Sequence, residues 1–161
     1  IDGSVRRLEL ALKANIAEVN AIRAQKNALL STDAEAAAGF YKEADENMQA
    51  MFDAVDAGLA IASAEGKPHW EKLRTVGEKF REKSAELQQL DARGDKSGAM
   101  ALSLGDLRTM TDDMGGAIAA LTEIQRKGMQ ATNNANTELY DSTKLVLTTA
   151  SGIAVLIALG A

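Results

Sequence analysis

Apolar residues recur every three or four positions along almost the whole chain, which is the spacing of one face of an α-helix. Three short segments interrupt this pattern with N-capping side chains, a proline and a C-capping glycine: Ser31-Thr32-Asp33, Gly66-Lys67-Pro68 and Gly94-Asp95. The pattern therefore predicts four helices, over about residues 2–31, 33–65, 68–93 and 96 onward. Because short turns force antiparallel neighbours, we expect an all-α, up-down-up-down four-helix bundle.

The apolar positions also fit heptads, so they predict which side chains form the bundle core. The stripe of the first helix comprises Val5, Leu8, Leu12, Val19, Ile22 and Leu29. Those of the second and third comprise Tyr41, Ala44, Met48, Met51, Val55, Gly58 and Ala62, and Leu73, Val76, Phe80, Leu87 and Leu90. That of the fourth comprises Leu107, Met110, Met114, Ala117, Leu121 and Ile124.

The residues from Leu145 to Ala161 carry no charge, and the fourth helix runs into them without a capping residue. At 1.5 Å per residue this run is about 25 Å long, close to the roughly 30 Å of a bilayer's hydrocarbon core. We therefore expect an ectodomain, residues 1–144, followed by the start of a truncated transmembrane helix, residues 145–161. Tyr140 and Lys144 are residue types that anchor a helix at the membrane interface. A buried C-terminal core helix is the alternative.

Composition excludes several classes of function. The net charge of −5 disfavours a nucleic-acid partner, and the absence of cysteine excludes disulfides and thiolate metal sites. A di-iron centre in a bundle needs Glu-x-x-His pairs, but the single histidine, His69, follows Pro68 in a turn. In that position it cannot complete a nucleophile–base set, and no glycine-rich phosphate loop follows a strand. We predict no enzyme activity, no cofactor and no metal.

Several segments resemble the four-helix-bundle ligand-binding domain of bacterial methyl-accepting chemotaxis proteins. They are RRLELA at 6–11, NAIRAQKNALLSTD at 20–33, GDKSGAMA at 94–101, and the exit of the last helix into the apolar run. The resemblance implies a periplasmic sensor held in the inner membrane, which dimerises and binds a small ligand within the upper bundle or across the dimer interface. It also implies that a small displacement of the fourth helix carries the signal. The same domain type occurs on sensor histidine kinases and nucleotide cyclases, so the output remains open.

Candidate ligand-binding residues are polar side chains at or beside core positions of the membrane-distal half. Continuing the first stripe from Ile22 places Lys26 in the core, with Arg23, Asn20 and Asn27 beside it. Placing two cations against an apolar seam costs free energy unless an anion pairs with them. We therefore expect a ligand that carries a carboxylate. Alternatively, both cations reach water or pair with nearby carboxylates, of which the sequence offers Asp33, Glu35, Asp112 and Asp113.

Further candidates lie on the other helices. Arg74 and Arg81 are seven residues apart on the third helix, one step off its core stripe, where a solvated face interlaced with glutamates is the alternative. Thr111 flanks the fourth stripe, where its hydroxyl could donate a hydrogen bond to a carboxylate. The alternative is an ordinary threonine at the boundary of the core. Tyr41 brings a phenol to the second stripe, where most tyrosines are simply core. A structural bundle without a ligand is the alternative function, and it predicts that Lys26 and Arg23 are both paired internally.

Overall fold

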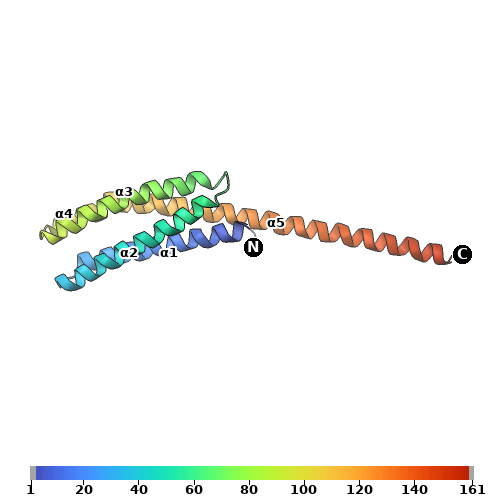
Figure 1. Cartoon of the computed structure of the whole chain (residues 1–161), viewed down its shortest axis with the longest axis horizontal. Helices are drawn as coiled ribbons and strands as arrows, with labels where there is room; N and C mark the ends of the chain where they lie inside the picture. Colours follow the sequence, from blue (N-terminus) through green and yellow to red (C-terminus); the bar gives the residue numbers. More distant parts are fainter. Residues whose placement is uncertain (1–2, 160–161) are drawn as a thin grey trace. The chain divides into compact units, whose positions relative to one another are not determined.

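The computed structural model describes the backbone of residues 3–159 and the side chains of residues 3–137 and 139. The elements are α1 (Gly3–Leu30), α2 (Ala34–Ala60), α3 (Lys67–Ala92), α4 (Lys96–Leu104) and α5 (Asp106–Leu159). Backbone contacts divide the chain into two compact units, Ile1–Gln125 and Arg126–Ala161. The first unit is the antiparallel four-helix bundle that the sequence predicts, and α4 with the start of α5 forms its fourth rod. The α1–α2 and α3–α4 turns lie at one end of this bundle, here called the turn end (Figure 1).

The predicted capping residues end and begin the helices as expected. The Asp33 carboxylate accepts the Ala36 backbone N–H at 2.7 Å, and the Asp95 carboxylate accepts the Gly98 N–H at 2.8 Å. Proline stands in the first turn of α3. Gly94 follows α3 with a φ of 80°, a conformation that glycine adopts without the steric cost of a Cβ. These local interactions fix the turns that the sequence predicts.

Two predicted helix bounds are wrong. α2 ends at Ala60 instead of 65, because the chain turns there and the Ile61 N–H bonds to the carbonyls of Gly58 and Leu59. The helix predicted from 96 onward is broken at Gly105, which separates α4 from α5. The Gly105 N–H bonds to the Ala101 carbonyl at 2.9 Å, which closes the last turn of α4. Since the apolar pattern continues across the break, periodicity alone does not reveal it.

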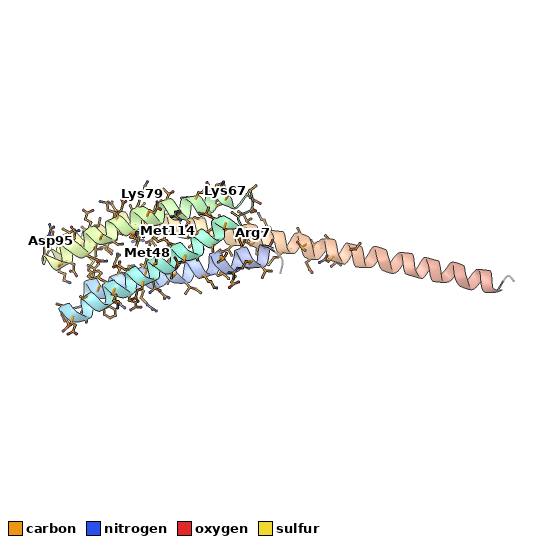
Figure 2. All side chains as sticks on the ribbon, in the orientation of Figure 1. Arg7, Met48, Lys67, Lys79, Asp95 and Met114 are labelled. Carbon is orange, nitrogen blue, oxygen red and sulfur yellow. The ribbon has the colours of Figure 1, made fainter. Side chains whose placement is uncertain are left out.

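The predicted stripes of α2, α3 and the fourth rod are confirmed as the core. Their largest buried side chains are Met48, Met51, Phe52, Val55, Leu73, Phe80, Leu87, Leu107, Met114 and Leu121. Figure 2 shows Met48 and Met114 inside the bundle and Lys79 on its outer side. Trp70 is also fully buried, and it packs directly on Gly58 of α2.

Only part of the predicted α1 stripe faces the core: Leu29 is buried and Ile22 packs against the core, whereas other members are exposed. Val5, Leu12 and Val19 are 45%, 45% and 54% exposed. The buried face instead carries every alanine of the helix, namely Ala11, Ala14, Ala17, Ala21, Ala24 and Ala28, together with Leu10 and Leu29. Because the inward face differs, Lys26 is exposed, and its predicted place in the core is wrong.

Within the part of the chain that the structure describes, no helix combines the length and the apolar character needed to cross a membrane. The backbone of α5 is helical to Leu159. The side chains of Tyr140, Lys144 and residues 145–161 lie outside the described residues, so membrane insertion and interfacial anchoring stay predictions.

Candidate ligand-binding site

A cavity of about 370 Å³ lies between α1, α3, α4 and α5, and we call it the α1–α5 cavity. Its volume falls in the range of small-molecule sites, roughly 300–1,000 Å³. Its lining comes from both sides of the break at Gly105 as well as from α1 and α3. The lining residues are Ile22, Gln25, Lys26, Phe80, Ser103, Leu104, Leu107, Arg108, Thr111 and Asp112.

The charged groups of this cavity come from two helices. Lys26 of α1 and Arg108 of α5 are exposed cations, and within the described residues neither forms an ion pair. Asp112 is the single carboxylate of the lining, so positive charge exceeds negative charge by one. Leu104, which is exposed, and Ile22, which is half-buried, supply the accessible apolar surface beside these cations. Such a combination suits an anion that carries a hydrocarbon part.

Two side chains of the cavity are already held by the bundle. The Gln25 amide donates to the Ser84 hydroxyl at 2.8 Å, a buried bond between α1 and α3. The Thr111 hydroxyl donates to the Leu107 carbonyl of its own helix at 2.9 Å. The Thr111 proton is therefore engaged, so Lys26 and Arg108 are the lining groups whose charge can attract an anion.

The other residues predicted on α1 do not enter this cavity. Arg23 is exposed and forms an ion pair with Glu43 of α2, with 3.7 Å between nitrogen and oxygen. Asn20 lines a separate hollow of about 470 Å³ between α1 and α2. Asn27 is exposed. Only Lys26, of the four residues predicted on this helix, shares a cavity with another predicted residue, Thr111.

The predicted arginines of α3 are engaged with α2 instead of a cavity. Arg74 pairs with Asp56 and with Glu78, the latter at 3.2 Å. The Arg81 guanidinium lies 4.7 Å from the centre of the Phe52 ring, a cation–π contact. Both arginines thus bind the two helices together.

The residue that the sequence analysis missed is Arg108, which stands three positions before Thr111 and therefore on the same side of α5.

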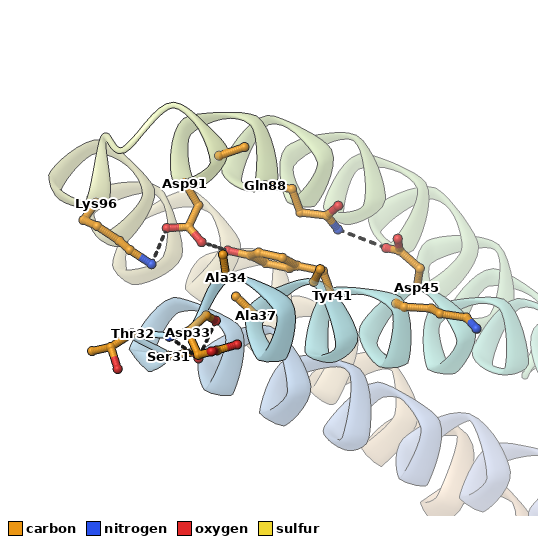
Figure 3. A pocket seen from close by; sticks show the side chains of 13 residues that line it. Ser31, Thr32, Asp33, Ala34, Ala37, Tyr41, Asp45, Gln88, Asp91 and Lys96 are labelled. Atoms are coloured by element: carbon orange, nitrogen blue, oxygen red, sulfur yellow. Dashed lines mark hydrogen bonds and ion pairs between the residues drawn. The ribbon is translucent and has the colours of Figure 1, made fainter.

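A larger cavity of about 910 Å³ lies between α2 and α3 at the turn end, and we call it the α2–α3 cavity (Figure 3). Small side chains leave the space open, since Ala34, Ala37, Ala38 and Ala92 line it. Its polar lining includes Tyr41, Lys42, Asp45, Gln88, Asp91 and Lys96. Tyr41, a predicted ligand-binding residue, therefore lies in a different cavity from Lys26 and Thr111.

Asp91 is the polar centre of the α2–α3 cavity. Its side chain is only 6% exposed, and Figure 3 shows Tyr41 and Lys96 converging on it. The Tyr41 hydroxyl donates to Oδ2 at 2.8 Å, and Lys96 Nζ lies 2.6 Å from Oδ1. Burial first, and then the neighbouring Asp91 carboxylate, raises the pKa of Tyr41, which keeps its phenol protonated as a donor. Lys96 Nζ also reaches the Leu29 carbonyl at 3.4 Å, so α1, α2, α3 and α4 meet here.

A further titratable group lies outside both cavities, on the inward face of α1. Glu18 is only 2% exposed, and burial raises the pKa of its carboxyl to about 7. Within the described residues no group of three or more histidine, aspartate or glutamate side chains is placed to hold a metal ion. Burial of the Glu18 carboxyl bears on stability, because its ionised form opposes folding.

No protein family, no curated protein and no solved structure matches this chain. The geometry of the two cavities and the sequence segments described above are therefore the basis for assigning a function.

Proposed function

We propose that this chain is the ligand-binding sensor domain of a transmembrane chemoreceptor of the methyl-accepting chemotaxis type. Its ligand is a small anionic metabolite, such as an organic acid, bound in the α1–α5 cavity. The observation that carries the proposal is the pair of cations, Lys26 and Arg108, which line one cavity without ion pairs in the described part of the chain. In a protein with a net charge of −5, such a local excess of positive charge favours anions at this position.

A carboxylate would gain hydrogen bonds assisted by charge from both cations. Each such bond contributes about 1.5–3 kcal/mol, and contact of the hydrocarbon part with Ile22 and Leu104 adds to it. Association and the ordering of two long exposed side chains cost several kcal/mol in return.

The position of the cavity suggests how binding would be transmitted. A ligand there contacts α1 on one side, and Ser103 of α4 and Arg108 of α5 on the other side of the Gly105 break. If it binds one arrangement of α5 more tightly than another, it shifts the population toward that arrangement. This differential affinity is what the proposed signal along the fourth rod requires.

The proposal includes a homodimer that pairs along α1. Val5, Leu12, Ile16 and Val19 are all at least 45% exposed and follow one another at intervals of seven, four and three residues. A stripe with these intervals suits pairing with the same stripe of a second copy. Residues 145–161 would insert in the inner membrane and leave residues 1–144 in the periplasm. The proposal assigns no nucleic-acid partner and no enzyme activity.

Two alternatives remain. The same domain could precede a sensor histidine kinase or a cyclase, because the ligand chemistry is independent of the output. A structural bundle without a ligand requires Lys26 and Arg23 both to be paired internally. Arg23 has an exposed partner at 3.7 Å, whereas Lys26 has none within the described residues. Because Lys26 is exposed and can reach water without a partner, this difference does not separate the two functions, and the ligand screen below does.

A thermal-shift screen of mono- and dicarboxylic acids, followed by calorimetric titration, tests this function. A saturating ligand raises the melting temperature by several degrees, because it binds only the folded state. We expect Lys26→Ala and Arg108→Ala each to weaken binding by about tenfold or more, a change of roughly 1.4 kcal/mol. Arg23→Ala is the matched control, since it removes a cation of the same helix outside the cavity. Unchanged affinity in both cavity variants would remove the proposed site.

A further inference from the structure

The α2–α3 cavity contains a buried carboxylate that the proposed sensor site does not use. Asp91 points into this cavity with its side chain 6% exposed (Figure 3). Tyr41 holds Oδ2, but Oδ1 is a buried oxygen that accepts no hydrogen bond from a described residue. Lys96 Nζ lies 2.6 Å from Oδ1, close enough for an ion pair but without the direction of a hydrogen bond. The carboxylate therefore has two partners, the Tyr41 hydroxyl on Oδ2 and the Lys96 ammonium paired with Oδ1.

We propose that the α2–α3 cavity is a second ligand site, which takes a small organic amine. The ammonium group of this ligand donates to Asp91 Oδ1 and replaces Lys96 there. The site is independent of the α1–α5 cavity and selects the opposite charge.

Charge and shape both favour an amine. Asp33, Asp45 and Asp91 line the cavity against two lysines, so an entering anion meets an excess of negative charge. The Tyr41 ring beside Asp91 offers an aromatic face, which attracts a cation, while its hydroxyl fixes the carboxylate. The alanines of the lining leave apolar space for the organic part of the ligand.

Lys96 is a partner that an ammonium ligand can displace. Its side chain is 52% exposed at the start of α4, so it can turn into water without losing its charge or burying it. The lysine regains rotamer freedom when it is released, which offsets part of the ordering of the ligand. Charge balance at Asp91 is preserved because one ammonium replaces another. Release also frees Lys96 from the Leu29 carbonyl, so binding loosens the junction between α4 and α1.

Calorimetric titration of the whole 161-residue chain with 2-phenylethylamine tests the site. The uncharged 2-phenylethanol and the anionic 3-phenylpropionate have similar size and serve as ligand controls. We expect saturable binding of the amine at this cavity, weakened about tenfold or more in Asp91→Asn. Lys96→Met should instead tighten binding, because it removes the competing ammonium while leaving the carboxylate in place. A merely structural ion pair would not produce that increase.

Matched variants separate this site from the proposed sensor site. Asp53→Asn removes an exposed carboxylate of α2 outside the α2–α3 cavity and should bind the amine like the wild type. Arg108→Ala should also keep amine binding while losing organic-acid binding, so the two proposals fail separately. No saturable amine binding up to about 10 mM, or weaker binding in Lys96→Met, overturns the amine site. If Asp91→Asn does not fold, the Lys96→Met result decides.

Discussion

The two long faces of α1 differ in a way that reverses the usual expectation. The inward face carries all six alanines of the helix with Glu18 and Gln25, whereas the larger aliphatic residues Val5, Leu12 and Ile16 point to solvent. Small side chains let α1 lie close to its neighbours within one chain. Of the larger aliphatic side chains of α1, Leu10 and Leu29 are buried, whereas the exposed ones gain no burial within the single chain. The spacing of its apolar residues therefore identifies α1 as a helix. The size of those residues does not identify the face that packs into the bundle.

The two faces of α1 also differ in what they contribute to the free energy of folding. Burying a valine, leucine or isoleucine side chain contributes about 1.5–3 kcal/mol, and the exposed stripe of α1 does not gain this within the single chain. The same apolar surface is available when two copies pair. Meanwhile the inward face includes a carboxyl, Glu18, that opposes folding whenever it is ionised. The following substitutions test each face in turn.

The largest expected effect comes from Glu18 on the inward face. Burial raises the pKa of its carboxyl from 4.5 to about 7, so the folded state binds this proton more tightly than the unfolded state does. The stabilisation is full below pH 4.5 and is lost as pH rises through about 7. At about 1.4 kcal/mol per pKa unit, the loss amounts to roughly 3 kcal/mol. We expect Glu18→Gln to raise the unfolding free energy by that amount at pH 8 and to change it little at pH 4.

Urea denaturation of both proteins at the two pH values measures this difference. Glu9→Gln is a suitable control, because Glu9 is an exposed carboxylate of the same helix that pairs with Arg6 and Lys13. Equal stability of Glu18→Gln and the wild type at pH 8 would show that Glu18 is not buried as an isolated carboxyl.

A second substitution tests how closely the alanine face packs. Ala14 is fully buried, so Ala14→Leu inserts a larger side chain where helices already touch. Overpacking of this kind costs about 1–3 kcal/mol. Asn27→Leu places the same side chain on the exposed part of α1 and should change stability by no more than about 0.5 kcal/mol. Similar effects of the two substitutions, measured by chemical denaturation, would mean that α1 has no preferred face.

The smallest expected effect on folding comes from the outward stripe. Ile16→Lys combined with Val19→Lys should change the unfolding free energy of the single chain by less than about 1 kcal/mol, since both side chains are more than half exposed. The same double variant should abolish the proposed dimer, because pairing would bury two charges in each copy of the stripe. Analytical ultracentrifugation measures the dimer and thermal unfolding the stability. A dimer that survives the double substitution pairs through another surface.

The parts of the fold that depend on local chemistry were predictable from the sequence. Asp33 and Asp95 cap helices, and Gly94 adopts the positive φ that its position after α3 requires. The rotation of α1 was not predictable, because its alanines and its larger aliphatic residues both recur at helical intervals. The break at Gly105 was also missed, because a single glycine is tolerated within a helix and the apolar pattern continues past it.

The rotation of α1 and the break at Gly105 also explain which residues of the candidate site could be predicted from the sequence. Lys26 and Thr111 were both predicted, and they do line one cavity. Lys26 reaches it as an exposed residue at the edge of the bundle, and not from the core position that the predicted stripe gave it. Arg108 was missed because its place depends on how α5 begins after Gly105. Arg23 pairs with α2, a partner that only the rotation of α1 determines.

The most direct test of the proposed function is to locate a bound organic acid on the chain. Backbone amide resonances in an ¹⁵N-labelled sample are followed while the best acid from the thermal screen is added. We predict shifts confined to the segments around Lys26 and Arg108, with no response around Tyr41, and loss of these shifts in Arg108→Ala. Shifts centred on other segments, or shifts that persist unchanged in Arg108→Ala, would contradict the assignment of the α1–α5 cavity as the sensor site.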